Sequence, residues 1–142
     1  MLSKILYYFR MLIAVLFLAT AANITYWSIE EPAVIFENNN TDYGITSQGE
    51  PLVCIVSFDV RKETKIKFRR WAEHKNNKYR VPVLEGTAFV KPEDSTTSYQ
   101  YTMKLPDNIP LGEYELHAEV EHKINPMRTY RQTFNWGNFE VM

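Results

Sequence analysis

Two patterns of hydrophobic positions divide the chain. From Met11 to Ile29, nineteen consecutive residues carry no charge. As a helix, this run would be about 28 Å long, close to the hydrocarbon thickness of a bilayer. From Ser28 onward, apolar and polar residues alternate instead, and turn-forming residues recur at short intervals, which is typical of half-buried strands. The patterns therefore predict one hydrophobic helix followed by an all-β domain.

The alternation also predicts how the β domain is organised. It is clearest in residues 52–60, 99–105, 114–120 and 130–136, where one side of each strand is apolar and the other polar. Strands with one buried and one solvated face are typical of antiparallel sheets. We predict seven to eight strands. The domain boundaries would be 1–29 for the hydrophobic helix, 30–40 for a short linker or first strand, and 41–142 for a β-sandwich.

The hydrophobic helix can be interpreted as a cleaved signal peptide. Lys4 and Arg10 would form its basic start, and the apolar centre follows directly. Ala19-Thr20-Ala21 then matches the small-x-small pattern that precedes a signal peptidase cut. On this interpretation the mature protein begins after Ala21 and is secreted or periplasmic.

The same segment can instead be an uncleaved signal anchor that contacts the lipid bilayer through residues 5–29. Tyr26 and Trp27 lie where an interfacial aromatic belt would fall. In both interpretations Lys4 and Arg10 stay on the cytoplasmic side, and the β domain goes outside. The two alternatives remain open from the sequence.

Charge and cysteine content narrow the class of protein. With 16 Lys and Arg against 17 Asp and Glu, the net charge is −1, so nucleic acid is not expected as a partner. Cys54 is the only cysteine, so an exported domain has no intrachain disulfide and depends on packing. This favours a bacterial or viral source. Cys54 lies on the apolar face of its strand, where a thiol is expected to be inert.

The most specific local motif of the β domain is the segment from Leu105 to Tyr114. After a corner rich in Pro, Asp and Asn, Gly112 and Tyr114 open a strand. This arrangement resembles the tyrosine corner of immunoglobulin-like sandwiches. The resemblance implies an immunoglobulin-like antiparallel β-sandwich in which the Tyr114 hydroxyl bonds to backbone a few residues upstream.

Two further positions are similar to that fold. Cys54 on an early strand and Trp71 on the next resemble its conserved Cys and Trp, with Leu116 in place of the second Cys. The resemblance therefore implies structural roles for Cys54 and Trp71. Ile66 and Phe68 share one face of their strand, however, so Trp71 reaches that face only if a bulge intervenes.

A further resemblance covers the whole chain. The hydrophobic leader, the sandwich, the corner Ile109–Tyr114 and the last hairpin Ile124–Thr129 are similar to small, largely uncharacterised bacteriophage membrane-associated proteins. This resemblance implies an envelope-directed phage product whose partners are envelope or virion proteins. It implies no catalytic residue.

A basic stripe is the main candidate binding feature. Residues 61–80 contain nine of the sixteen basic side chains, and alternation puts Lys65, Lys67 and Arg69 on one strand face. With Arg70 and Trp71, this stripe could bind anionic head groups, wall polymers or another polyanion. The simpler interpretation is a solvated sheet face, which is favoured because acidic residues interrupt the run.

An acidic strip lies on a later strand, formed by Glu113, Glu115, His117, Glu119 and Glu121. Neighbours on one strand face are about 7 Å apart, so this strip alone is not a metal site. We expect it to pair across the hairpin with Arg128 and Arg131. Because one strip is basic and the other acidic, copies of the domain could also associate head to tail into a homo-oligomer.

No sequence motif points to an enzyme. HExxH, a phosphate-binding loop, a nucleophile elbow and zinc-ligand spacing are all missing from the sequence. We therefore predict a non-enzymatic binding or structural module without cofactor or metal, anchored in the membrane and displaying its sandwich outside. The alternative is a cleaved, soluble sandwich that binds a polyanion through the basic stripe 61–80.

Overall fold

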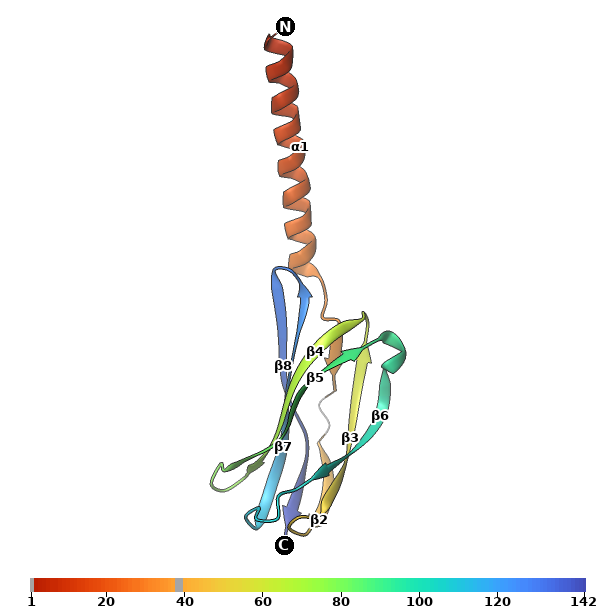
Figure 1. Cartoon of the computed structure of the whole chain (residues 1–142), viewed down its shortest axis with the longest axis vertical. Coiled ribbons are helices and arrows are strands. Elements are labelled where there is room, and N and C mark those ends of the chain that lie inside the picture. The colour runs from red at the N-terminus through yellow and green to blue at the C-terminus, as the bar shows by residue number, and fades with distance from the viewer. Residues whose placement is uncertain (1, 38–39) are drawn as a thin grey trace.

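The protein consists of one N-terminal helix and two β-sheets (Figure 1), in a computed structural model that describes residues 2–37 and 40–142. The helix is α1 (Leu2–Ile29). The strands are β1 (Val34–Phe36), β2 (Thr41–Thr46), β3 (Pro51–Val60), β4 (Thr64–His74), β5 (Arg80–Val90), β6 (Thr96–Lys104), β7 (Gly112–Asn125) and β8 (Arg128–Val141), and a short 3₁₀ helix η1 (Pro92–Asp94) precedes β6. The expected hydrophobic helix followed by an all-β domain is confirmed.

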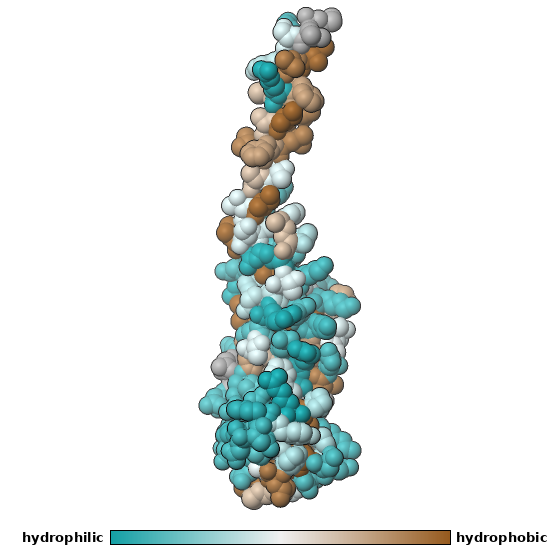
Figure 2. Space-filling view, turned by 90° about the vertical axis from the view of Figure 1, so that its left-hand side faces the viewer, coloured by the Kyte–Doolittle hydropathy of each residue, from teal (hydrophilic) through white to brown (hydrophobic). Residues whose placement is uncertain are grey.

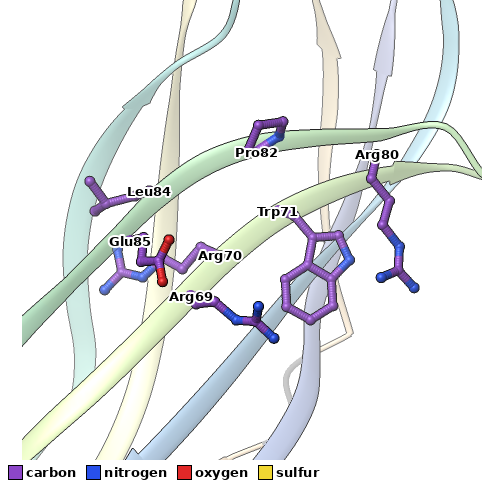
Figure 3. Close-up of a pocket in the computed structure, with 7 residues that line it drawn as sticks. All are labelled: Arg69, Arg70, Trp71, Arg80, Pro82, Leu84 and Glu85. Carbon is purple, nitrogen blue, oxygen red and sulfur yellow. The ribbon is translucent and has the colours of Figure 1, made fainter.

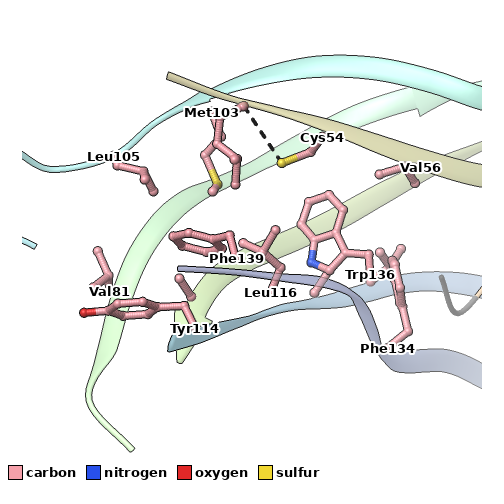
Figure 4. Packing of buried hydrophobic residues seen from close by; sticks show 14 of the residues in the cluster. Cys54, Val56, Val81, Met103, Leu105, Tyr114, Leu116, Phe134, Trp136 and Phe139 are labelled. Atoms are coloured by element: carbon pink, nitrogen blue, oxygen red, sulfur yellow. Dashed lines mark hydrogen bonds between the residues drawn. The ribbon is translucent and has the colours of Figure 1, made fainter. Parts of the chain in front are cut away.

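The sheets pack face to face as a sandwich. One sheet has the order β1-β3-β6 and the other β2-β8-β7-β4-β5. The parallel pair is β2 with β8, and the other pairs are antiparallel. Figure 4 shows Tyr114, Trp136 and Phe139 of the larger sheet facing Cys54 and Met103 of the smaller one. The inward residues alternate with outward polar ones, as the sequence pattern predicts.

Helix α1 is apolar all round and is not covered by the sandwich. Its segment Ser3–Ile29 contains an 18-residue stretch with a mean hydropathy of 2.0, none of which is buried. Figure 2 shows this helix as a mostly hydrophobic rod above a mostly hydrophilic body. It is long and apolar enough to cross a bilayer, a property that a signal anchor and a signal peptide share.

The C-terminal end of α1 meets the tip of the β7–β8 hairpin (Figure 1). One guanidinium nitrogen of Arg128 donates to the carbonyl oxygens of Trp27, Ser28 and Glu30 at 3.3, 2.7 and 3.1 Å. The amide of Asn125 donates to the Trp27 carbonyl at 2.8 Å and to the Glu30 carboxylate at 3.0 Å. These donors satisfy carbonyls that a helix leaves unpaired at its end. We call this set of contacts the hairpin clamp.

The segment after the helix is also fastened to the sandwich. Glu30 pairs with Lys62 at 3.2 Å, and Glu31 pairs with Arg61. The Asn125 and Lys62 hydrogen bonds lower the pKa of the Glu30 carboxyl. The backbone N–H of Ala33 then donates to Nε2 of the buried His122 at 3.0 Å. The predicted linker of residues 30–40 thus enters β1 through a series of fixed contacts, and its residues 38–39 lie outside the described part.

The expected tyrosine corner is present at the start of β7. The Tyr114 hydroxyl donates to the Pro110 carbonyl at 2.7 Å, and its buried ring stacks on Phe139 at 5.3 Å between centroids. Gly112 has a φ of +131°, and a Cβ there would lie 2.5 Å from Nε2 of His74. Glycine is therefore required at this corner.

Trp71 does not occupy the core position that the resemblance implies. It lies on the outer face of β4, and its ring stacks on His117 at 5.7 Å. The register shift between Arg70 and Trp71 affects pairing with β5 but not with β7, so the alternation along β4 continues. The indole in the core belongs to Trp136 on β8, which is 1% exposed.

His122 makes the stability of the fold depend on pH. Its Nε2 accepts the Ala33 N–H, so this nitrogen is unprotonated in the folded protein, and burial lowers the pKa of the imidazole. The unfolded chain takes up a proton near the ordinary His pKa of about 6.5, before the folded chain does. The free energy of unfolding should therefore decrease as the pH falls from about 7.5 to about 5.5.

Urea unfolding of the full-length chain in detergent micelles at these two pH values checks this. Both lie above the range in which the Glu30 carboxyl of the clamp titrates, because its pKa is lowered. His122→Gln should reduce the pH dependence. An equal slope in wild type and His122→Gln would contradict the expectation.

Candidate binding face of the five-stranded sheet

The predicted basic stripe is divided between the two faces of β4. Lys65, Lys67, Arg69 and Trp71 lie on the outer face of the five-stranded sheet, whereas Arg70 faces the other sheet. Successive side chains of a strand point to opposite faces, so the Arg70 side chain projects away from that of Arg69. The five residues thus do not form one continuous docking stripe.

The outer-face cations lie directly beside the acidic strip. In the pairing of β4 with β7, Lys67 is opposite Glu121, Arg69 opposite Glu119 and Trp71 opposite His117. Arg69 contacts the Glu119 carboxylate at 3.0 Å. The basic and acidic side chains of this face neutralise each other's charge. This arrangement argues against binding of a polyanion by the basic strip and against head-to-tail association through separate strips.

One of the two predicted hairpin ion pairs forms. Arg131 contacts the Glu121 carboxylate through Nε at 3.1 Å and through a second nitrogen at 2.5 Å. This hydrogen bonding lowers the pKa of the Glu121 carboxyl. The expected pairing of Arg128 with the acidic strip is wrong. Arg128 begins β8 at the hairpin tip, where the carbonyls at the end of α1 are its partners.

Arg70 holds the two sheets together through aromatic contacts. Its guanidinium lies 4.3 Å from the centroid of Tyr101, 4.8 Å from that of Phe68 and 5.2 Å from that of Trp136. Tyr101 comes from β6, and its ring stacks on Trp136 of β8 at 5.2 Å. A partly desolvated cation over aromatic rings is stabilising. Arg70 is therefore a packing residue between the sheets.

A pocket of about 430 Å³ lies between β4 and β5 at the edge of the larger sheet (Figure 3). Trp71 lies between His117 on one side and the Arg80 guanidinium on the other, 5.3 Å from the ring centroid. Arg80 also binds Glu73 at 2.8 Å, which lowers the pKa of that carboxyl. The lining residues are Arg69, Arg70, Trp71, Arg80, Pro82, Leu84 and Glu85. The pocket therefore brings three residues of the predicted stripe together, but with neighbouring carboxylates.

Cys54 is a packing residue. Its side chain is fully buried, and its thiol lies 3.9 Å from the Leu52 carbonyl. Burial raises the pKa of the thiol to about 11, so little reactive thiolate forms at neutral pH. Within residues 2–37 and 40–142, no three His, Cys, Asp or Glu side chains gather as metal ligands.

Sequence reasoning missed the residues that join the helix to the sandwich. It placed Asn125 in a hairpin turn and Arg128 in an ion pair, and it assigned no role to His122. The last hairpin, expected at Ile124–Thr129, is present. Contacts to the end of α1 span about a hundred positions in the sequence, and no local pattern indicates them.

Comparison with known proteins finds likeness to solved structures. No family model matches the chain, and no curated protein matches it. One similar solved structure is the ASH / PapD-like domain of human CEP192 (PapD-like domain 7), at 13% sequence identity and a TM-score of 0.47. The likeness covers 79% of this chain and 89% of that one.

The opposite orientations of Arg69 and Arg70 predict unequal effects on stability. Arg70→Ala should lower the free energy of unfolding by about 1–2 kcal/mol, because it removes the cation and its stem from between the aromatic rings. Arg69→Ala should change it by no more than about 0.5 kcal/mol, because it removes an exposed ion pair. Urea unfolding of both full-length variants in micelles checks this, and equal losses would contradict the assignment.

Proposed function

We propose that this chain is a membrane-anchored, non-enzymatic binding or structural module. Helix α1 crosses the cytoplasmic membrane as an uncleaved signal anchor, and the sandwich stands outside and works through protein contacts. The observation that carries the proposal is the hairpin clamp, in which Asn125 and Arg128 bond to the last carbonyls of α1.

The clamp favours an anchor over a removable leader. Cleavage after Ala21 would leave residues 22–29 as the only part of α1, and a free helix of this length is not stable in water. It would also leave the apolar side chains of Ile24, Tyr26 and Ile29 exposed on a soluble protein. An intact α1 places the same side chains in a bilayer, where they are stabilised.

The distribution of charge supports the orientation. Lys4 and Arg10 lie at the N-terminal end of α1, and Glu30 and Glu31 follow its C-terminal end. Basic residues beside a membrane helix favour the cytoplasmic side. The N-terminus is therefore cytoplasmic in this proposal, and the sandwich is periplasmic or extracytoplasmic.

We infer that the sandwich is immunoglobulin-like. Two features support this: the bonded tyrosine corner at the start of β7, and the division of strands into β1-β3-β6 and β2-β8-β7-β4-β5. Such sandwiches bind partners through sheet faces and end loops. The outer face of the larger sheet and its edge pocket beside β5 are the surfaces that we assign to contact.

The bacteriophage origin stays a prediction of this proposal. The hydrophobic leader, the corner at Ile109–Tyr114 and the last hairpin support it. It implies that the partners are envelope or virion proteins, met at the outer surface of the cytoplasmic membrane.

Expression of the full-length chain in a bacterium tests the anchoring. We expect a membrane-bound species with an intact mass of about 16.7 kDa, whose sandwich is digested by protease added to spheroplasts but not to intact cells. Leu16→Arg, which places a charge near the middle of α1, should lower the membrane-bound fraction. A soluble species that begins at Ala22 would contradict the anchor and favour secretion.

A further inference from the structure

The position of the hairpin tip relative to the membrane follows from the length of α1. The uncharged run from Met11 to Ile29 is about 28 Å long as a helix, against about 30 Å for the hydrocarbon core. With Arg10 at the inner boundary, Ile29 and Glu30 reach the outer one. The clamp contacts Trp27, Ser28 and Glu30, so the hairpin tip lies at the level of the outer headgroups.

The chemistry of the tip suits this layer. The Asn125 side-chain oxygen accepts the backbone N–H groups of Met127 and Arg128, both at 3.0 Å. Pro126 has no N–H to satisfy. The turn therefore presents an apolar side chain without unpaired backbone donors, and Met127 is 57% exposed. Exposed apolar groups beside a membrane segment are favourable where acyl chains meet headgroups.

The clamp also fixes the tip in place. Arg128 and Asn125 connect the turn to the last turn of α1 from one side, and Lys62 holds Glu30 from another. The tip cannot leave the interface unless these bonds break or α1 leaves the membrane. A rigid connection of this kind would keep the long axis of the sandwich roughly parallel to that of α1 (Figure 1).

We propose that Pro126 and Met127 form a second membrane contact, a foot inserted at the boundary between headgroups and acyl chains of the bilayer that α1 crosses. The proposal rests on the proposed anchoring. The helix and the foot together keep the sandwich upright, so the sheet face and the edge beside β5 point along the membrane surface and the opposite end points away from it.

A depth measurement in vesicles tests the foot. Met127→Cys in the full-length chain is labelled with an environment-sensitive fluorophore and reconstituted into phosphatidylcholine–phosphatidylglycerol vesicles containing a lipid quencher at a shallow acyl position. Leu111→Cys is the matched control, because Leu111 is similarly exposed, at 60%, and lies at the opposite end of β7. Buried Cys54 stays unlabelled while the sandwich is folded.

We expect quenching at position 127 to be several-fold stronger than at position 111. Equal quenching in chains that remain in the vesicles would overturn the foot and leave the anchoring intact. Chains that do not remain in the vesicles would overturn the anchoring, and the foot with it.

Substitutions in the hairpin clamp test whether it holds position 127 at the membrane. In the Met127→Cys background, Arg128→Gln should reduce quenching at position 127, because the turn is released from α1. Arg131→Gln is the control on the same strand, since Arg131 binds Glu121 and not the helix, and it should leave quenching unchanged. The protected Cys54 thiol reports that each variant is folded. Unchanged quenching in a folded Arg128→Gln chain would overturn the role of the clamp.

Discussion

An α-helix ends with carbonyl groups that have no partner within the helix, and in α1 the β7–β8 hairpin supplies donors for them. Arg128 donates to three backbone oxygens, and Asn125 donates to one of them, the carbonyl of Trp27. Asn125 also closes the turn that carries both residues. The orientation of the sandwich depends on these bonds. Without them the helix would be joined to the sheets through the segment leading into β1 and its contacts with Lys62, Arg61 and His122, and the long axis of the domain would be less constrained.

A second set of contacts, those of Arg70 with aromatic rings, joins the two sheets. Arg70 projects from β4 into the space between the sheets and contacts aromatic rings of both. Outside, the same strand is beside β7, so its cations are compensated by the acidic strip. A strand rich in basic residues therefore yields a nearly neutral outer face and an internal cation, which suits specific contact with a protein better than attraction of a polyanion.

The features that the sequence predicts well are those that local patterns determine. Hydropathy indicates α1, alternation indicates the strands, and the Gly112 and Tyr114 spacing indicates the corner whose hydrogen bond is present. The orientation of Trp71 and the partner of Arg128 depend on strand register and on a contact between the helix and a hairpin about a hundred residues later. Such contacts arise from tertiary packing, so a single sequence does not indicate them.

If the hairpin clamp holds as described, α1 and the sandwich form one rigid body. A distance distribution between spin labels on Thr20→Cys in α1 and Thr133→Cys on β8, in the full-length chain in nanodiscs, tests it most directly. Both side chains are exposed, and the native thiol of Cys54 is buried. We expect a single narrow distribution that broadens in Arg128→Gln. A broad distribution in the chain with an intact clamp would contradict it.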